Sequence, residues 1–360
     1  GLHGLSAPAK VLDMGNAGTA IRLSMGLLAG QRFESVLTGD SSLRSRPMER
    51  VAKPLRQMGA DILTTDGKPP VTVRPVATLS GIDYLLPVAS AQVKSAILLA
   101  GLYAQGFTTV TEPAPTRDHT ERMLRGFGVQ VETDGARIRL QGRQTLTGTR
   151  IDVPGDISSA AFFLVAGSIA GSGDYVIENV GVNPTRTGVI DILKLMGADI
   201  TVVPRAAQGG EPVADLHVRR AELRGIAVPE SLVPLAIDEL PVLFIAAAAA
   251  RGETVFTGAA ELRVKESDRL AVMADGLTRL GVGNELAPDG IRIEGLAGTG
   301  RRLGGGEVES HGDHRIAMSF TVASLLADAP IRIRDTENVG TSFPGFVATA
   351  RACGLQVEER

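Results

Sequence analysis

The decapeptide ELRVKESDRL (residues 261–270) holds the residues of this chain whose types and spacing best suit chemistry. It sets the cations Lys265 and Arg269 beside the carboxylates Glu266 and Asp268. Four positions separate the two cations, so a helix would place both on one face. Cations next to a carboxylate suit a doubly anionic substrate that gains or loses a proton. A solvated helix with ordinary ion pairs has the same residue types, and both interpretations stay open at this point.

Two other segments are typical of helix N-termini that hold an anion, because the first N–H groups of a helix lack backbone partners. GNAGTA (residues 15–20) contains Gly18, which leaves room for a ligand, and SAQVKS (residues 90–95) adds hydroxyl, amide and ammonium donors. The alternative for each is a capped helix entry without a ligand. For DISS (residues 156–159) we favour that alternative.

Arginines accompany these loops. Arg46 precedes Pro47, which restricts Arg46 to an extended backbone. Arg117 in TRDHTER could equally form an ordinary ion pair at a helix start. We interpret Arg315 in HGDHR (residues 311–315) as an anion clamp, because the histidines and aspartate there match no strong zinc or iron pattern. No metal and no cofactor is therefore predicted.

A carboxylate precedes the alanine-rich run of the chain. Asp238 stands in AIDELP, where a helix is expected to begin. Two interpretations are open: Asp238 caps that helix, or it accepts a proton from a substrate hydroxyl.

Composition limits the classes of protein. At 360 residues the chain is long enough for two domains, and 44% hydrophobic with 21% charged residues is ordinary for a globular enzyme. A net charge of −3 argues against a nucleic-acid partner. The single cysteine, Cys353, excludes a disulfide framework, and no apolar run reaches membrane-spanning length. We expect a cytoplasmic monomer without a membrane partner.

A repeat runs through the chain. A helix-like segment, a glycine and a short strand recur five times, as LRQMGADIL, LRGFGVQVE, LKLMGADIT, LTRLGVGNE and ARACGLQVE. Each central glycine is expected to adopt the left-handed conformation that ends a helix. With the intervening β-type runs, one unit reads strand–helix–strand–helix–strand–strand over about 70 residues. Five copies predict that one N-terminal unit of this length is absent, and the seam between domains is expected near Gly155.

Taken together, the motifs resemble one family, the 5-enolpyruvylshikimate-3-phosphate synthases. They are GNAGTAIRL, LTGDSSLRSRPM, SAQVKSAILLAG, TRDHTE, AIDELP, RVKESDRL, DHRIAMSF and TSFP, in the family's order from about Val11 to the end. SAQVKS and RVKESDR are more similar to the class II, glyphosate-tolerant branch. The resemblance implies an α/β fold (α+β in strict classifications) with two inside-out barrel domains of βαβαββ repeats, here residues 1–155, lacking a first repeat, and 156–360.

The resemblance also implies the activity. The family transfers the enolpyruvyl group of phosphoenolpyruvate to the 5-hydroxyl of shikimate 3-phosphate and releases phosphate, and closure of the two domains is expected to assemble the site. The match implies that shikimate 3-phosphate is bound by Ser90, Ala91, Gln92, Arg117, Asp238 and Lys265, that phosphoenolpyruvate is bound by Gly18, Arg46, Gln92, Arg269 and Arg315, and that Asp238, Glu266 and Lys265 are catalytic.

Two alternatives remain. The family carries a Lys-Ser-x-x-x-Arg motif in its first unit, which this chain lacks. The chain could therefore be a catalytically incomplete fragment that binds ligands, or work with a separately supplied N-terminal segment. The other alternative, a UDP-N-acetylglucosamine enolpyruvyl transferase, normally uses a loop cysteine, whereas Cys353 lies in repeat-like sequence. Glycine at position 18, where the tolerant branch often has alanine, leaves the response to the inhibitor glyphosate open.

Overall fold

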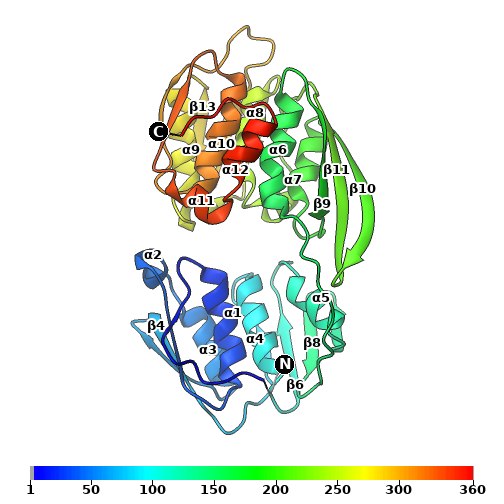
Figure 1. Cartoon of the computed structure of the whole chain (residues 1–360), viewed down its shortest axis with the longest axis vertical. Helices are drawn as coiled ribbons and strands as arrows, with labels where there is room; N and C mark the ends of the chain where they lie inside the picture. The colour runs from blue at the N-terminus through cyan, green and yellow to red at the C-terminus, as the bar shows by residue number, and fades with distance from the viewer. Residues whose placement is uncertain (1–3, 360) are drawn as a thin grey trace. The chain divides into compact units, whose positions relative to one another are not determined.

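The computed structural model describes residues 4–359, and these form two compact units. Unit 1 comprises residues up to 152 together with 209–211, and unit 2 comprises residues 153–208 and 212 onwards. In Figure 1 unit 1 runs from blue to cyan, and unit 2 from green to red. The seam expected from the sequence, near Gly155, lies two residues after Val153, the first residue of unit 2.

Unit 1 consists of two βαβαββ repeats with the same topology. The first contains β1 (Leu12–Asp13), α1 (Gly18–Ala29), β2 (Ser35–Thr38), α2 (Ser41–Ser45), α3 (Glu49–Gln57), β3 (Asp61–Thr65) and β4 (Lys68–Arg74). The second contains β5 (Asp83–Leu85), α4 (Ala91–Gly101), β6 (Phe107–Thr111), α5 (His119–Gly126), β7 (Val131–Asp134) and β8 (Arg137–Gln141). The sheets have the orders β1-β2-β4-β3 and β5-β6-β8-β7, each with one parallel and two antiparallel pairings.

Unit 2 repeats this pattern, although its first two repeats lack a full leading strand. Its first two repeats contain α6 (Ile157–Ile169), β9 (Asp174–Gly181), α7 (Gly188–Leu195), β10 (Asp199–Gln208) and β11 (Glu211–Arg219), then α8 (Leu240–Ala249), β12 (Glu253–Phe256), α9 (Arg269–Arg279), β13 (Asn284–Ala287) and β14 (Gly290–Glu294). The third contains β15 (Gly306–Glu309), α10 (His314–Ala323), β16 (Ile331–Arg334), α11 (Glu337–Ser342) and α12 (Phe346–Ala352). Single parallel bridges, Gly155 to Val180 and Ala227 to Val255, stand where the first two repeats would have a leading strand.

The five repeat glycines confirm the predicted helix ends. After α3, the N–H of Gly59 donates to the carbonyl of Arg56 at 2.9 Å and the N–H of Ala60 to that of Leu55 at 3.1 Å. This pair of hydrogen bonds satisfies helix carbonyls that would otherwise lack partners, and it needs a left-handed residue. The same pattern ends α5, α7, α9 and α12 at glycines with φ between +84° and +96°, namely Gly128, Gly197, Gly281 and Gly354.

Apolar helices fill the interior of each unit. In unit 2, α6, α8 and α10 pack against one another, and each also packs on a strand of its own repeat. Helix α8, LPVLFIAAAA, is buried along almost its whole length, which its uniformly apolar sequence requires. In unit 1, α1 and α4 take the interior position. Helices inside and sheets outside confirm the α/β fold with βαβαββ repeats. No helix in residues 4–359 is long and apolar enough to cross a membrane.

The two inner helices of unit 1 approach closely at Gly26. A Cβ atom there would lie 2.1 Å from the carbonyl oxygen of Ala96 on α4, so alanine would force the helices apart. We expect Gly26→Ala to lower the free energy of unfolding by about 1–3 kcal/mol, as overpacked cores do. Gly340→Ala is the matched control, because Gly340 lies in α11 with open space around it, and should change stability by less than about 1 kcal/mol. Urea denaturation of both variants measures this, and equal stabilities would contradict the close approach.

Candidate active site

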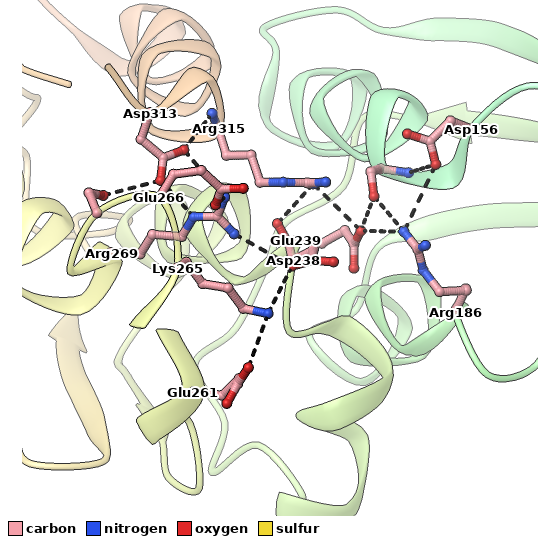
Figure 2. A network of polar contacts seen from close by, with 12 residues as sticks. Asp156, Arg186, Asp238, Glu239, Glu261, Lys265, Glu266, Arg269, Asp313 and Arg315 are labelled. Atoms are coloured by element: carbon pink, nitrogen blue, oxygen red, sulfur yellow. Dashed lines mark hydrogen bonds and ion pairs between the residues drawn. The ribbon is translucent and has the colours of Figure 1, made fainter. Parts of the chain in front are cut away.

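A buried arginine organises the charged cluster of unit 2. The guanidinium of Arg269 is 1% exposed and donates from Nε to Asp313 at 2.8 Å, while its terminal nitrogens lie 2.5 Å from Glu266 and 3.5 Å from Asp238. Burial alone would lower the pKa of Arg269, but the three carboxylates, Asp313 foremost, outweigh it and raise that pKa. Arg269 is therefore a fixed cation that holds three carboxylates together, as Figure 2 shows.

Lys265 and Arg269 do not share a helix face, so that prediction is wrong. The 3-10 helix η3 (Ala260–Val264) ends before Lys265, whose backbone is extended, and α9 begins only at Arg269. Asp268 caps α9 by accepting a hydrogen bond from the N–H of Ala271 at 3.0 Å. The two cations meet at a shared carboxylate instead: the Lys265 ammonium lies 3.6 Å from Asp238.

Asp238 does not cap α8, so that interpretation is also wrong. The residue at the N-cap position is Glu239, and its side chain makes no capping hydrogen bond. The Asp238 carboxylate is 14% exposed and lies between Lys265 and Arg269, while its backbone carbonyl accepts a hydrogen bond from Arg315 at 3.1 Å. Asp238 is therefore a member of the charged cluster, with two cations beside its carboxylate, rather than a helix cap.

Asp313 joins this cluster to the start of α10. It is fully buried, caps the helix by accepting from the N–H of Arg315 at 3.0 Å, and also accepts from the hydroxyl of Ser267 at 3.1 Å. Burial would raise the pKa of Asp313, yet the charge and hydrogen bond of Arg269, together with His314 and the N–H of Arg315, outweigh burial and lower it. The HGDHR segment thus holds Arg269 through Asp313, and the same carboxylate accepts from the N–H of Arg315. Among the described residues, no group of three potential ligands could hold a metal ion.

A second buried carboxylate extends the network, and sequence reasoning missed it. Glu239 is 2% exposed; it lies 3.1 Å from Arg186 and 3.8 Å from Arg315, and it accepts a hydrogen bond from Ser158. Arg186 also donates to Ser158 at 2.6 Å. Asp156 caps α6 by accepting from the N–H of Ser158, as predicted for DISS. The available signal was Arg186 itself, the first lysine or arginine in the sequence after Arg150.

In unit 1 a cluster of arginines surrounds the start of α1. A Cβ on Gly18, the first residue of α1, would lie 3.0 Å from Arg46 and 3.3 Å from Arg22. Arg22 is 6% exposed and donates to Gln92 at 2.5 Å. Burial, with Arg50 and Arg46 nearby, lowers the pKa of Arg22 to about 10, so it remains a cation at neutral pH. Sequence reasoning missed Arg22, although it is the only cation in an apolar helix.

The start of α4 lies beside this cluster. Ser90 caps α4, its hydroxyl accepting from the N–H of Val93 at 3.4 Å, and Ala91 is the first residue of the helix. The amide of Gln92 donates to Thr19 of α1 at 2.8 Å. The predicted loop residue Arg117 precedes α5, whose N-cap is Asp118. Unit 1 therefore brings Gly18, Arg46, Ser90, Ala91 and Gln92 to the adjoining N-termini of α1 and α4.

The fold defines the class of protein. The structure matches that of the enolpyruvyl transferase NikO from Streptomyces tendae with a TM-score of 0.71, over 93% of this chain and 76% of that one. At 17% sequence identity this likeness concerns the fold alone. The chain has the enolpyruvyl transferase fold.

Closer relatives identify the family. The EPSP synthase (3-phosphoshikimate 1-carboxyvinyltransferase) family profile matches residues 2–349. The 3-phosphoshikimate 1-carboxyvinyltransferase of Alkalilimnicola ehrlichii is 64% identical over 99% of this chain and 79% of its own length. The EPSP synthase structure from Acinetobacter baumannii matches with a TM-score of 0.92 at 59% identity, over 99% of this chain and 82% of that one. The chain belongs to the EPSP synthase family and is an enzyme of the transferase class.

His314, next to Asp313, makes stability depend on pH. Burial first, and Arg315 second, lower its pKa below the ordinary 6.5. Below that value the unfolded chain binds a proton that the folded chain does not, so the free energy of unfolding falls as the pH falls through it. We expect His314→Gln to flatten this dependence between roughly pH 7 and pH 5. Chemical denaturation across that range tests it, and equal slopes for both proteins would refute the assignment.

Proposed function

We propose that this chain transfers the enolpyruvyl group of phosphoenolpyruvate to the 5-hydroxyl of shikimate 3-phosphate, with Asp238 as the group that removes the hydroxyl proton. The observation that carries this assignment is the position of the Asp238 carboxylate, between the Lys265 ammonium at 3.6 Å and the Arg269 guanidinium at 3.5 Å. A carboxylate so placed can accept a proton while the adjacent cations attract the phosphate and carboxylate of the substrates.

The reaction needs a proton to be added and one to be removed. The hydroxyl oxygen bonds to C2 of phosphoenolpyruvate while C3 gains a proton; C3 then loses a proton as the C2–O bond to phosphate breaks. Glu266, ion-paired with Arg269 at 2.5 Å and 35% exposed, is the group we assign to C3. Lys265 can assist either transfer. Arg269 and Arg315 hold phosphoenolpyruvate, and their fixed charges stabilise the anion that develops.

The residues of unit 1 are assigned to substrate binding. Ser90, Ala91 and Gln92 bind shikimate 3-phosphate at the N-terminus of α4, where unpaired N–H groups favour an anion, and Arg117 binds its phosphate. Gly18, Arg46 and Gln92 bind phosphoenolpyruvate at the N-terminus of α1. To these we add Arg22, because it donates to Gln92 and lies beside Arg46.

Repeat symmetry supports a further proposal. Unit 2 has three inner helices, whereas the described part of unit 1 has two, α1 and α4. We propose that one more βαβαββ unit of about 70 residues completes unit 1 in the working enzyme, as the family's two domains of three units each imply. The chain spans 79% to 82% of the length of the relatives named above. A cytoplasmic location and a monomeric state are part of the same proposal.

Phosphate release from phosphoenolpyruvate tests the reaction. We expect release with shikimate 3-phosphate as acceptor and none with UDP-N-acetylglucosamine, because Cys353 is an exposed residue at the end of α12 rather than a member of the charged cluster. Release with the nucleotide sugar would overturn the proposal. If both acceptors give none, the chain is the incomplete, ligand-binding form, and adding the family's N-terminal unit in trans should then restore release.

Asp238→Asn separates catalysis from binding. Asparagine keeps the shape of the side chain but cannot accept the hydroxyl proton, so turnover should fall by about 10²–10⁴-fold. The dissociation constant of shikimate 3-phosphate should change far less. Steady-state kinetics and calorimetric titration measure the two quantities. Equal losses in turnover and affinity would make Asp238 a binding residue instead.

A further inference from the structure

A buried lysine in α4 lies outside every role assigned above. Lys94 is 1% exposed, and its ammonium lies 3.0 Å from Glu112 and 2.7 Å from Glu121, whose side chains are 6% and 3% exposed. Lysine and glutamate are almost never buried this completely unless they are paired. The three side chains form one charged trio inside unit 1, away from solvent.

The trio is a costly arrangement. It holds one positive against two negative charges, and Oε2 of Glu121 is buried without a hydrogen-bond partner among the described residues. Replacing buried ion pairs by apolar residues of similar volume is often neutral or stabilising. Stability is therefore a poor reason for three charges at this place, and the geometry that they impose is a better one.

The trio fastens a loop to the first turns of α4. Glu112 directly follows β6, and its carboxylate also accepts a hydrogen bond from Thr116. Glu121 lies in the first turn of α5. A second contact, between the hydroxyls of Ser95 and Thr120 at 2.7 Å, runs parallel to the first. Together these bonds tie both ends of the loop at residues 113–118, which carries Arg117, to α4.

The opposite side of the same helix turn is also fixed. Gln92, two residues before Lys94, accepts from Arg22 at 2.5 Å and donates to Thr19 at 2.8 Å. The start of α4 is thus held by α1 on one side and by the trio on the other. Any shift of α4 would move Ser90 and Gln92 relative to Arg117.

We infer that Lys94 is a positioning residue for the shikimate 3-phosphate site. It sets the spacing between the N-terminus of α4, with Ser90 and Gln92, and the loop of Arg117. The inference rests on the proposed function, because those residues are the ones assigned to this substrate. Lys94 itself is buried behind them and acts through Glu112 and Glu121.

Removing the charges of the trio distinguishes a positioning role from a purely electrostatic one, because the two roles predict opposite changes in affinity for an anion. The triple variant Lys94→Met, Glu112→Gln, Glu121→Gln removes every charge, so the net charge near the site rises from −1 to zero. Electrostatics alone would then strengthen binding of an anion. Loss of positioning should weaken it, by about tenfold or more, because small misplacements of binding groups are costly.

The experiment is calorimetric titration of the chain with shikimate 3-phosphate, with thermal unfolding measured alongside. Leu98→Ala is the matched control: Leu98 is buried in the same helix and makes no polar contact with its side chain, so this variant should lose stability but keep its affinity. Glu112→Gln, which leaves the Lys94–Glu121 pair balanced, should fold and show a smaller loss of affinity in the same direction.

The outcomes separate the inference from the proposed function. Weaker binding by the triple variant and Glu112→Gln, with unchanged binding by Leu98→Ala, is the expected result. Unchanged or tighter binding by the triple variant, or by Glu112→Gln if the triple variant does not fold, would overturn the positioning role alone. Failure of the unaltered chain to bind shikimate 3-phosphate would overturn the assignment of this substrate to the site, and the inference with it.

Discussion

The buried guanidinium of Arg269 is the interaction on which the charged cluster of unit 2 depends. A buried cation must be paired, and Arg269 is paired with Asp313, Glu266 and Asp238, which come from three separate segments of the chain. Its contacts fix the starts of α9 and α10 relative to the segment before α8. Without Arg269 these carboxylates would lie close together with too little positive charge beside them, which would cost free energy. The pairing with Arg269 therefore favours the single arrangement of the cluster that the structure shows.

Apolar helices make that arrangement possible by leaving polar groups only at their ends. The interiors of α6, α8 and α10 hold almost no charge, whereas Asp156, Glu239 and Asp313 stand at or next to their N-caps. In unit 1 the N-termini of α1 and α4 adjoin each other in the same way. The repeat therefore produces several helix N-termini suited to anions, and the side chains that differ between repeats give each its chemistry.

The sequence predicted what local chemistry decides, and it failed where distant segments meet. The five glycine helix ends, the cap at Asp156 and the strands between them follow from nearby residues, and all occur. The shared helix face of Lys265 and Arg269 was wrong, because spacing cannot reveal that the chain stays extended between them. Arg22 was missed for the same reason. Its partner Gln92 lies 70 residues away, so only the fold shows the contact.

The two units differ in how their cations are balanced. In unit 2, four cations, Lys265, Arg269, Arg315 and Arg186, are ion-paired with six carboxylates, Asp238, Glu266, Asp313, Glu239, Glu261 and Asp156, so each of these cations has a carboxylate partner before any ligand binds. In unit 1, Arg22 and Arg46 donate to amide, hydroxyl and carbonyl oxygens, with no carboxylate among their hydrogen-bond partners in the described residues. The lowered pKa of Arg22 is the consequence, since burial and like charges there are not compensated. An anionic ligand would supply the missing negative charge in unit 1, whereas the cations of unit 2 already have carboxylates beside them. Of the two clusters, the arginines at the start of α1 therefore depend more on a bound anion for the compensation of their charge.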